Sequence, residues 1–404
     1  MINNRLHTTA GVKDYLPAEC ALKNDIEKKV RAVFDSYNYK CVITPMFEYM
    51  EVYEGTGSVD AKRMYKFVDR DGSILALRPD VTPAIARIAA TACDEADLPF
   101  RFSYVGNAFR YNESYQGKLR EFTQAGIELI GVNSIEADAE AVSVAINSLL
   151  AVGIDDFRID IADVDFLKGV LEEAELGTEL SEEIIDSVID KNYVGVCEIV
   201  NNLDMSDKLK QLFNDLPLLI GEIDVLDTAK SLVNNEKSIN AIEYMRRLYN
   251  LLDACGYAKY ISFDLSVTGH FDYYTGIVFR AYTRGTGFSV IDGGRYDRLV
   301  DNYGASYPAV GLAVKVNDIM SVLEGRNDYG ATSSAEYLTV FNEEGRTAAM
   351  KEADRLRKEG KTVEMGLLGF DVTGSVAYAR KNGIKKVLCF DGQGITEINT
   401  EEAE

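Results

Sequence analysis

The chain contains 404 residues, and its 43 lysines and arginines against 65 aspartates and glutamates give a formal net charge of −22 at pH 7. This charge opposes a large contact with nucleic acid, in which lysine and arginine must neutralise phosphates. The six cysteines are widely spaced and only two histidines accompany them, so we expect reduced, mostly buried thiols and no metal site. The N-terminal sequence does not resemble a signal peptide and no apolar run reaches membrane-spanning length, so we expect a cytoplasmic protein that does not contact a membrane.

The first predicted element is a helix that begins at Pro17 and ends near residue 38. Its apolar residues recur at helical spacing and form one stripe, and proline is favoured in the first turn of a helix. A short strand at residues 41–44 follows and ends at a proline. Residues 64–68 and 74–77 flank an Asp-Gly sequence, which predicts a hairpin.

The sequence Leu-Arg-Pro-Asp-Val-Thr-Pro at residues 77–83 precedes a predicted helix at residues 83–92. Thr82 can cap this helix, with proline at its first position. Residues 100–128 then predict a pair of antiparallel strands, and a serine-capped helix ends near residue 152. Residues 157–161 alternate apolar and polar side chains, as an edge strand or a half-buried strand does.

Residues 109–128 carry the most distinctive group of polar side chains in the chain. Arg110 and Arg120 lie on two extended runs that a turn-forming Tyr-Gln-Gly-Lys sequence joins, so both guanidinium groups could meet one phosphate or carboxylate. Gln124 and Glu128 follow at even spacing and therefore share one face of a strand. An amide and a carboxylate on one face suit the ammonium or imidazole group of a ligand. A hairpin with solvated charges remains the alternative.

Residues 165–257 combine acidic runs with apolar residues at helical spacing, which predicts a helical insertion. Strands resume at residues 261–267, 273–282 and 288–291. The glycine pair at 293–294 is typical of a strand-to-helix turn, and it would also let the backbone approach a ligand. After a linker near residues 325–335, the order strand, helix, strand, helix, strand predicts a small α/β domain.

These segments together resemble the class II aminoacyl-tRNA synthetases in their histidyl form. Helix, strand and proline at residues 17–45 resemble motif 1, which builds a dimer interface in that family. Phe-Arg at 109–110, with Gly117, Arg120, Gln124 and Glu128, resembles motif 2. Three further sequences resemble the histidyl signatures around the amino acid: Asp80 with Thr82, Asp-Tyr-Tyr-Thr-Gly at 272–276, and Asp-Gly-Gly-Arg-Tyr-Asp at 292–297.

The resemblance implies an α+β fold, in which a class II synthetase-like antiparallel sheet is flanked by helices. The synthetase-like core would comprise residues 1–164 and 258–325, the helical insertion residues 165–257, and a shortened anticodon-binding-like α/β domain residues 336–404. It also implies a homodimer and a histidine-binding pocket. That pocket would be lined by Asp80, Thr82, Arg110, Gln124, Glu128, Tyr273 and Tyr274, and Arg110 with Arg120 would form a candidate phosphate-binding pair.

Two positions depart from the pattern of the aminoacylating enzymes. Where these enzymes have an arginine that assists amino-acid activation, the chain has Gly269. Where motif 3 has the arginine that meets the ATP phosphates, the chain has Asp318, although Lys315 could replace it in part. An anion at a phosphate-facing position reverses the sign of the Coulomb interaction. We therefore expect that adenylation is lost, and we assign no catalytic residue and no cofactor.

A histidyl pocket without the ATP arginine resembles one group closely, the regulatory subunits of ATP phosphoribosyltransferase. The resemblance implies a non-catalytic subunit that activates a short-form catalytic subunit in the first step of histidine biosynthesis and relays feedback by L-histidine. It also implies a homodimer within a hetero-oligomer, with no tRNA as a partner. Two alternatives stay open: a divergent, active histidyl-tRNA synthetase, and a free-standing histidine-binding paralogue.

Overall fold

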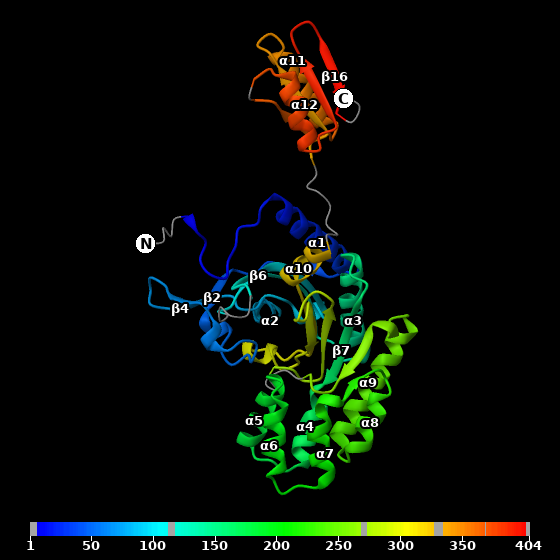
Figure 1. Cartoon of the computed structure of the whole chain (residues 1–404). Helices are drawn as coiled ribbons and strands as arrows, with labels where there is room; N and C mark the ends of the chain where they lie inside the picture. The colour runs from blue at the N-terminus through cyan, green and yellow to red at the C-terminus, as the bar shows by residue number, and fades with distance from the viewer. Residues whose placement is uncertain (1–5, 112–117, 268–272, 327–333, 368, 401–404) are drawn as a thin grey trace. The chain divides into compact units, whose positions relative to one another are not determined.

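The computed structural model describes residues 6–111, 118–267, 273–326, 334–367 and 369–400. The chain forms two compact units, Met1–Asp328 and Tyr329–Glu404 (Figure 1). The first unit contains all the residues that the sequence places in a ligand pocket. Among the described residues, no helix is long and apolar enough to cross a membrane.

A mixed sheet forms the centre of the first unit. In the described residues its spatial order is β1 (Lys40–Cys41), β5 (Phe100–Phe109), β6 (Glu121–Ile130), β12 (Ala309–Lys315), β11 (Ile291–Arg295), β10 (Ile277–Thr283), β7 (Phe157–Asp163), β9 (Ile261–Asp264) and β8 (Ile220–Gly221). Neighbouring strands are antiparallel except for the β1–β5 and β7–β9 pairs. The predicted pair within residues 100–128 is confirmed as the long β5–β6 hairpin.

Three helices cover one face of this sheet: α1 (Pro17–Ser36), α3 (Ile135–Ala151) and α10 (Val316–Arg326). The apolar stripe of α1 is buried against α3 and the sheet, in a core that also contains Ile127 and Leu129 of β6. Ser134 caps α3 as predicted, since its hydroxyl accepts from the N–H of Ala137 at 3.3 Å. Because side chains alternate along a strand, Gln124 and Glu128 point to the opposite face.

Of the two forms predicted for residues 157–161, the structure shows the half-buried strand, because burial alternates along these residues of β7 and the strand lies between β10 and β9. The glycine pair does not form a turn, because Gly293 and Gly294 continue β11. A Cβ atom on Gly293 would lie 2.3 Å from the ring of Phe279, and one on Gly294 would lie 2.6 Å from the carbonyl oxygen of Ile277. Close packing within the sheet therefore requires the two glycines.

A small sheet precedes the helix α2 (Thr82–Thr91) in the chain. Its strands have the spatial order β2 (Phe47–Tyr49), β4 (Ile74–Leu77) and β3 (Lys66–Val68). Large apolar side chains on and near this sheet are exposed to solvent: Ile43, Met46, Phe47, Tyr49, Phe67, Val68 and Ile74. We call these seven residues the apolar surface. Among them, the rings of Phe47 and Phe67 lie 5.7 Å apart between centroids, and grouped exposed apolar side chains favour an interaction site.

Helices α4 (Val164–Glu173), α5 (Thr178–Ile189), α6 (Tyr193–Asn201), α7 (Asp207–Asp215), α8 (Val225–Leu232) and α9 (Glu236–Ala254) follow β7, and we call them the helical region (Figure 1). Their apolar residues, such as Val170 and Leu248, belong to the same core as α1 and α3. The helical region is therefore packed onto the central sheet. Short 3-10 helices connect elements along the described part of the first unit: η2 (Met50–Val52), η3 (Ala61–Arg63), η4 (Glu95–Asp97), η6 (Leu216–Leu218), η7 (Ala258–Tyr260) and η8 (Val300–Tyr303).

The second unit is an α/β domain, as predicted, with one strand more than expected. Its described strands have the order β14 (Val363–Met365), β13 (Tyr337–Phe341), β15 (Lys386–Phe390) and β16 (Ile395–Asn399), of which only β16 is antiparallel to its neighbour. Helices α11 (Arg346–Lys358) and α12 (Val372–Lys381) pack into two separate apolar clusters. The additional strand is β16. It follows a turn that contains glycines and it is mostly exposed, so its apolar pattern is too weak to predict a strand.

All six cysteines are free thiols. The expectation that they are mostly buried was wrong, because only Cys389 is buried and Cys20, Cys41 and Cys255 are exposed. Cys41 lies on the edge strand β1 and Cys255 caps the C-terminus of α9, and both places face solvent.

Candidate functional site

A cavity of about 230 Å³, which we call the inner cavity, lies on the polar face of the central sheet. Strand β6 contributes Gln124 and Glu128, and strand β11 contributes Asp292 and the glycine pair. All seven residues that the sequence predicts for an amino-acid pocket line this cavity: Asp80, Thr82, Arg110, Gln124, Glu128, Tyr273 and Tyr274. The fold thus brings together residues that are up to about two hundred positions apart.

Glu128 forms the buried acidic end of the inner cavity. Its side chain is 1% exposed, and it accepts hydrogen bonds from the hydroxyl groups of Thr82, at 2.8 Å, and Tyr296. Burial raises the pKa of Glu128 to about 8, although the two hydroxyl donors act in the opposite direction. The carboxyl group is therefore largely protonated at neutral pH in the ligand-free chain, and a cationic ligand would favour its ionised form.

Strand β12 must pass very close to this carboxyl group. Gly311 is the residue directly opposite Glu128 across the β6–β12 pair. A Cβ atom on Gly311 would lie 1.8 Å from Oε2 of Glu128. Only glycine leaves room for the carboxyl group at this position.

Gln124 offers an acceptor that the protein itself does not use. Its side chain is 5% exposed, and its Oε1 atom is buried without a hydrogen-bond partner among the described residues. An unsatisfied buried carbonyl costs free energy, so a donor on a ligand would compensate it. Tyr273 and Tyr274 form the aromatic wall of the cavity, with Tyr273 stacked on Tyr296 at 5.6 Å between ring centroids.

The loop before α2 is held in place by a buried arginine. Arg78 is 7% exposed and donates to the carbonyl oxygens of Thr44, at 2.9 Å, and Asn107, at 2.5 Å. These bonds fix the start of the segment that carries Asp80. Arg110 approaches Asp80 at 3.8 Å between Nη2 and Oδ2, so an anion and a cation flank the same side of the inner cavity.

Thr82 does not cap α2, contrary to the prediction. It is the first residue of the helix, and Val81 occupies the cap position. The hydroxyl of Thr82 instead donates to Glu128. The hydroxyl that the sequence pattern assigns to a helix cap therefore serves instead as a hydrogen-bond donor to the buried carboxyl group of Glu128.

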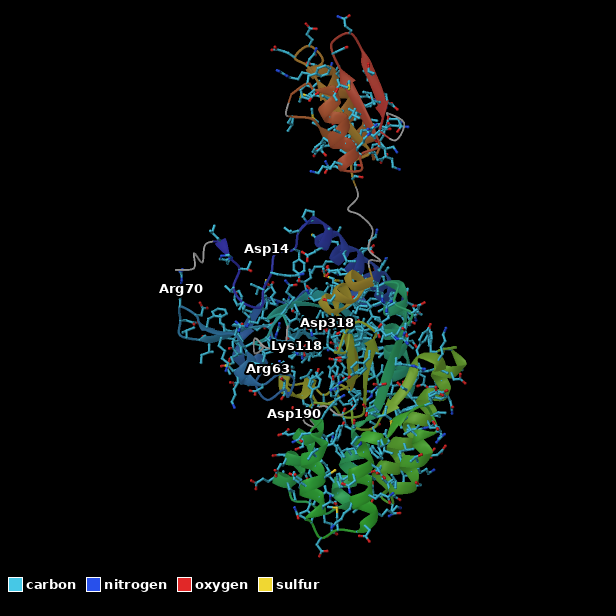
Figure 2. All side chains as sticks on the ribbon, in the orientation of Figure 1. Asp14, Arg63, Arg70, Lys118, Asp190 and Asp318 are labelled. Carbon is cyan, nitrogen blue, oxygen red and sulfur yellow. The ribbon has the colours of Figure 1, made fainter. Side chains whose placement is uncertain are left out.

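A second cavity of about 490 Å³, which we call the cationic cavity, shares Arg110, Phe122, Arg280 and Lys315 with the inner cavity. Its lining contains seven cationic side chains but only the acidic residues Asp318 and Glu324, in a chain that carries a large negative charge overall. The seven are Lys13, Arg63, Arg110, Lys118, Lys191, Arg280 and Lys315. Figure 2 shows Arg63, Lys118 and Asp318 together on the first unit.

The electrostatics of the cationic cavity favour an anion. Burial, followed by repulsion from Lys315 and Arg63, lowers the pKa of Lys118. Burial and repulsion from Arg110 likewise lower the pKa of Arg63. Burial raises the pKa of Asp318, although Lys315 and Lys118 oppose this shift. An anion that binds between these like charges reduces the repulsion between them.

The carbonyl oxygen of Arg120 accepts from the N–H of Arg110 at 2.9 Å, so the two residues are neighbours, but the side chain of Arg120 does not share a cavity with that of Arg110. It lines neither cavity, because its aliphatic stem packs over Gly11 and its guanidinium group lies 4.6 Å from the centroid of the Tyr111 ring. Arg110, by contrast, lines both cavities and lies over the ring of Phe122. Gly117 and Gly269 lie outside the described residues.

The sequence analysis assigned no role to Tyr296, Arg280 and Asp292, which all line the inner cavity. Asp292 is held by Lys315 at 2.6 Å, and Arg280 faces Asp292 directly across the β10–β11 pair. Tyr296 follows the glycine pair within the signature at residues 292–297, and this position could have identified it as a residue of the pocket. Arg280 lies in an ordinary strand sequence, which gives no indication of a ligand site.

Comparisons with known proteins agree on one family. A family model described as histidyl-tRNA synthetase matches residues 11–319. The ATP phosphoribosyltransferase regulatory subunit of Acetivibrio thermocellus is 40% identical over 402 residues, which cover 99% of this chain and 96% of that protein. The protein of the same name from Clostridium acetobutylicum is 34% identical over 403 residues, 99% of each chain.

Solved structures give the same result for the fold. The structure of an ATP phosphoribosyltransferase regulatory subunit/histidyl-tRNA synthetase from Bacillus halodurans covers 96% of this chain and 99% of its own, with a TM-score of 0.86 and 29% identity. The histidyl-tRNA synthetase from Nostoc sp. covers 100% of this chain and 99% of its own, with a TM-score of 0.81 and 22% identity. The expected α+β fold of the class II synthetases is confirmed.

Proposed function

The chain belongs to the ATP phosphoribosyltransferase regulatory subunits, which share the histidyl-tRNA synthetase fold, and we propose that its inner cavity binds L-histidine. The family is one of regulatory subunits of histidine biosynthesis and not of catalytic enzymes. The observation that carries the proposal is the buried Oε1 atom of Gln124, which no described residue of the chain hydrogen-bonds, within a cavity lined by Glu128 and Asp80. A zwitterion with an additional imidazole group supplies the donors that this arrangement lacks.

The residues suggest how histidine would lie. Asp80 and Thr82 would hold the ammonium group, as in the histidyl signature that they resemble, and Arg110 would face the carboxylate. Tyr273 or Tyr274 would reach the imidazole ring. Glu128, in a protonated or an ionised form, would pair with a nitrogen of the ligand.

Binding of histidine would be the signal in a complex with the short-form catalytic subunit, which this chain would activate. A ligand shifts such an equilibrium only if it binds one conformation of the complex more tightly than the other. We assign the apolar surface to a homodimer within this hetero-oligomer, because its seven exposed side chains need a cover. The proposal includes a cytoplasmic location and no role for tRNA.

A second binding function is favoured by the cationic cavity. We assign it to a phosphate-bearing ligand, because seven cationic side chains converge there against two acidic ones. Arg110 would contribute, whereas Arg120 lies outside the cavity. Binding of inorganic pyrophosphate, measured by calorimetry, should weaken in Lys118→Ala and stay unchanged in Lys28→Ala, since Lys28 lies on α1 outside the cavity.

The test of the main proposal is phosphoribosyl transfer to ATP by a short-form catalytic subunit, with and without this chain, followed by a histidine titration. We expect activation that histidine suppresses, and Gln124→Ala should raise the histidine concentration needed for suppression. No association and no activation would refute the proposal. Histidine-dependent exchange between ATP and pyrophosphate would then support the divergent synthetase, and binding of histidine without any enzymatic effect would support the free-standing paralogue.

A further inference from the structure

A buried ion pair lies directly behind the wall of the inner cavity. Arg295 is the last residue of β11 and directly precedes Tyr296, and its Nη2 and Nε atoms donate to Oδ1 of Asp138 at 2.6 and 3.0 Å. The side chains of Arg295 and Asp138 are 5% and 0% exposed. Asp138 lies in the first turn of α3, where the helix dipole favours a negative charge.

Arg295 also fixes the backbone segments that border the cavity. Its Nη1 atom donates to Oδ1 of Asp297 at 3.0 Å, and the same oxygen accepts from the N–H of Ala309, also at 3.0 Å. The N–H of Thr275 donates to the carbonyl oxygen of Arg295 at 2.8 Å, and Oγ1 of Thr275 accepts from the N–H of Asp297 at 2.9 Å. Thr275 directly follows Tyr274 of the aromatic wall in the sequence, and Asp297 directly follows Tyr296. The side chain of Arg295 therefore holds Asp297 and, through the carboxyl group of Asp297, the backbone of Ala309, whereas Thr275 is held by the backbone of residues 295 and 297.

The other end of the ion pair reaches the helical region. The hydroxyl of Tyr244, on α9, donates to Oδ2 of Asp138 at 2.5 Å. Burial, together with the charge of Asp138, raises the pKa of Tyr244, so the hydroxyl keeps its proton at all physiological pH values. Asp138 thus connects a residue beside the cavity with a residue of α9, and α9 packs on α4 and α8.

A buried ion pair resists separation because either charge alone would be left uncompensated. A movement of Arg295 would therefore be followed by Asp138 and, through Asp138, by the hydroxyl of Tyr244. The trigger is available at Tyr296, whose hydroxyl donates to Glu128. A ligand that took the place of this donor at Glu128 would displace Tyr296 and, with it, the adjacent backbone of Arg295.

We propose that Arg295, Asp138 and Tyr244 are positioning residues that couple occupancy of the inner cavity to helix α9. The inference rests on the proposed function, because it takes histidine as the ligand of the cavity. The helical region is then the part of the chain that responds to histidine, although it contributes no residue to the inner cavity.

The test compares Tyr244→Phe with Tyr249→Phe, a matched control on the same helix whose ring packs against Phe263 at 6.1 Å. Hydrogen exchange of α9 is measured with and without histidine, and histidine affinity is measured by calorimetry. We expect histidine to change exchange in α9 by about tenfold in the unmodified chain and in the control, a usual size for coupling between sites. In Tyr244→Phe the change should fall below about twofold while the affinity stays within about threefold. A full response of α9 in Tyr244→Phe would overturn the proposal.

A second measurement separates this proposal from the proposed function, because it needs no ligand. Melting temperatures are determined for Tyr244→Phe, Tyr296→Phe and the double variant. If the two residues are coupled, the change in melting temperature of the double variant differs from the sum of the changes in the two single variants by more than about 2 °C. Additive shifts would overturn the coupling, even if histidine binds. Failure of the unmodified chain to bind histidine would overturn the proposed function and leave the coupling to be decided by these shifts.

Discussion

Glu128 gives the sharpest prediction for stability. Its folded-state pKa of about 8 lies above the ordinary value of 4.5 because the carboxyl group is fully buried. For an acid with a raised pKa in the folded chain, stability is fully present below the unfolded value and is lost as pH rises from 4.5 through 8. At about 1.4 kcal/mol per pKa unit, the whole loss is about 5 kcal/mol, of which about 3 has occurred by pH 7 and a further 1 to 1.5 follows between pH 7 and 9.

Glu128→Gln keeps the shape of the side chain and removes the ionisation. The amide loses one acceptor for the hydroxyls of Thr82 and Tyr296, which costs about 1 kcal/mol at every pH. The difference in unfolding free energy between variant and unmodified chain should therefore move in favour of the variant by about 1 to 1.5 kcal/mol between pH 7 and 9. Urea unfolding followed by far-ultraviolet circular dichroism measures it, since the chain contains no tryptophan.

Glu121→Gln is the matched control for this experiment. Glu121 begins the same strand, outside the inner cavity, and accepts from Asn107 at 2.7 Å. Its substitution should shift the free energy of unfolding equally at pH 7 and pH 9. If Glu128→Gln also gave a constant difference, the carboxyl group would be ionised throughout this range and the reasoning about its burial would be refuted.

Three further changes test the cavities. Gln124→Ala should weaken histidine binding about tenfold without unfolding the chain, because it removes one buried hydrogen bond to the ligand, and calorimetry with an unchanged affinity would remove Gln124 from the site. Asp318→Arg alone should not produce histidine-dependent exchange between ATP and pyrophosphate, since Gly269 still departs from the synthetase pattern; clear exchange would show that residue 318 alone had abolished the activity. Gly311→Ala should lower the melting temperature by more than about 4 °C, because its Cβ would lie 1.8 Å from Glu128 Oε2, and an unchanged melting temperature would contradict this close approach.

The sequence predicts the inner cavity better than it predicts the elements around it. Gln124 and Glu128 belong to one strand face by simple alternation, and they line the cavity. Asp80, Tyr273 and Tyr274 come from other segments, and nothing in their local patterns brings them to β6. Their common position follows from the resemblance of the segments to one family, which carries information about tertiary structure that periodicity lacks.

Local patterns failed where tertiary contacts decide. Gly293 and Gly294 have the composition of a turn, but they form a strand because they pair with both β10 and β12, and glycine is needed there because Phe279 and the carbonyl oxygen of Ile277 leave no room for a Cβ atom. Arg120 carries the same charge as Arg110, but it is withdrawn from the cavities by Tyr111 and Gly11. In both cases the deciding contact comes from residues that the local sequence does not indicate.

Compared with the sequence pattern of the aminoacylating enzymes, the chain has the residues of the amino-acid pocket but an aspartate in place of the phosphate-facing arginine. This combination is physically consistent with a sensor of histidine. Under the proposed function, the chain must report the concentration of histidine, and it can do so only if histidine is released unchanged. Adenylation would consume the ligand and separate occupancy of the inner cavity from its concentration. Asp318 lines the cationic cavity beside Lys315 and Lys118, where it opposes the accumulation of negative charge on a reacting phosphate. Under the proposed function, the anion at residue 318 would thus preserve reversible binding of histidine, while the remaining cations would still hold a phosphate-bearing ligand.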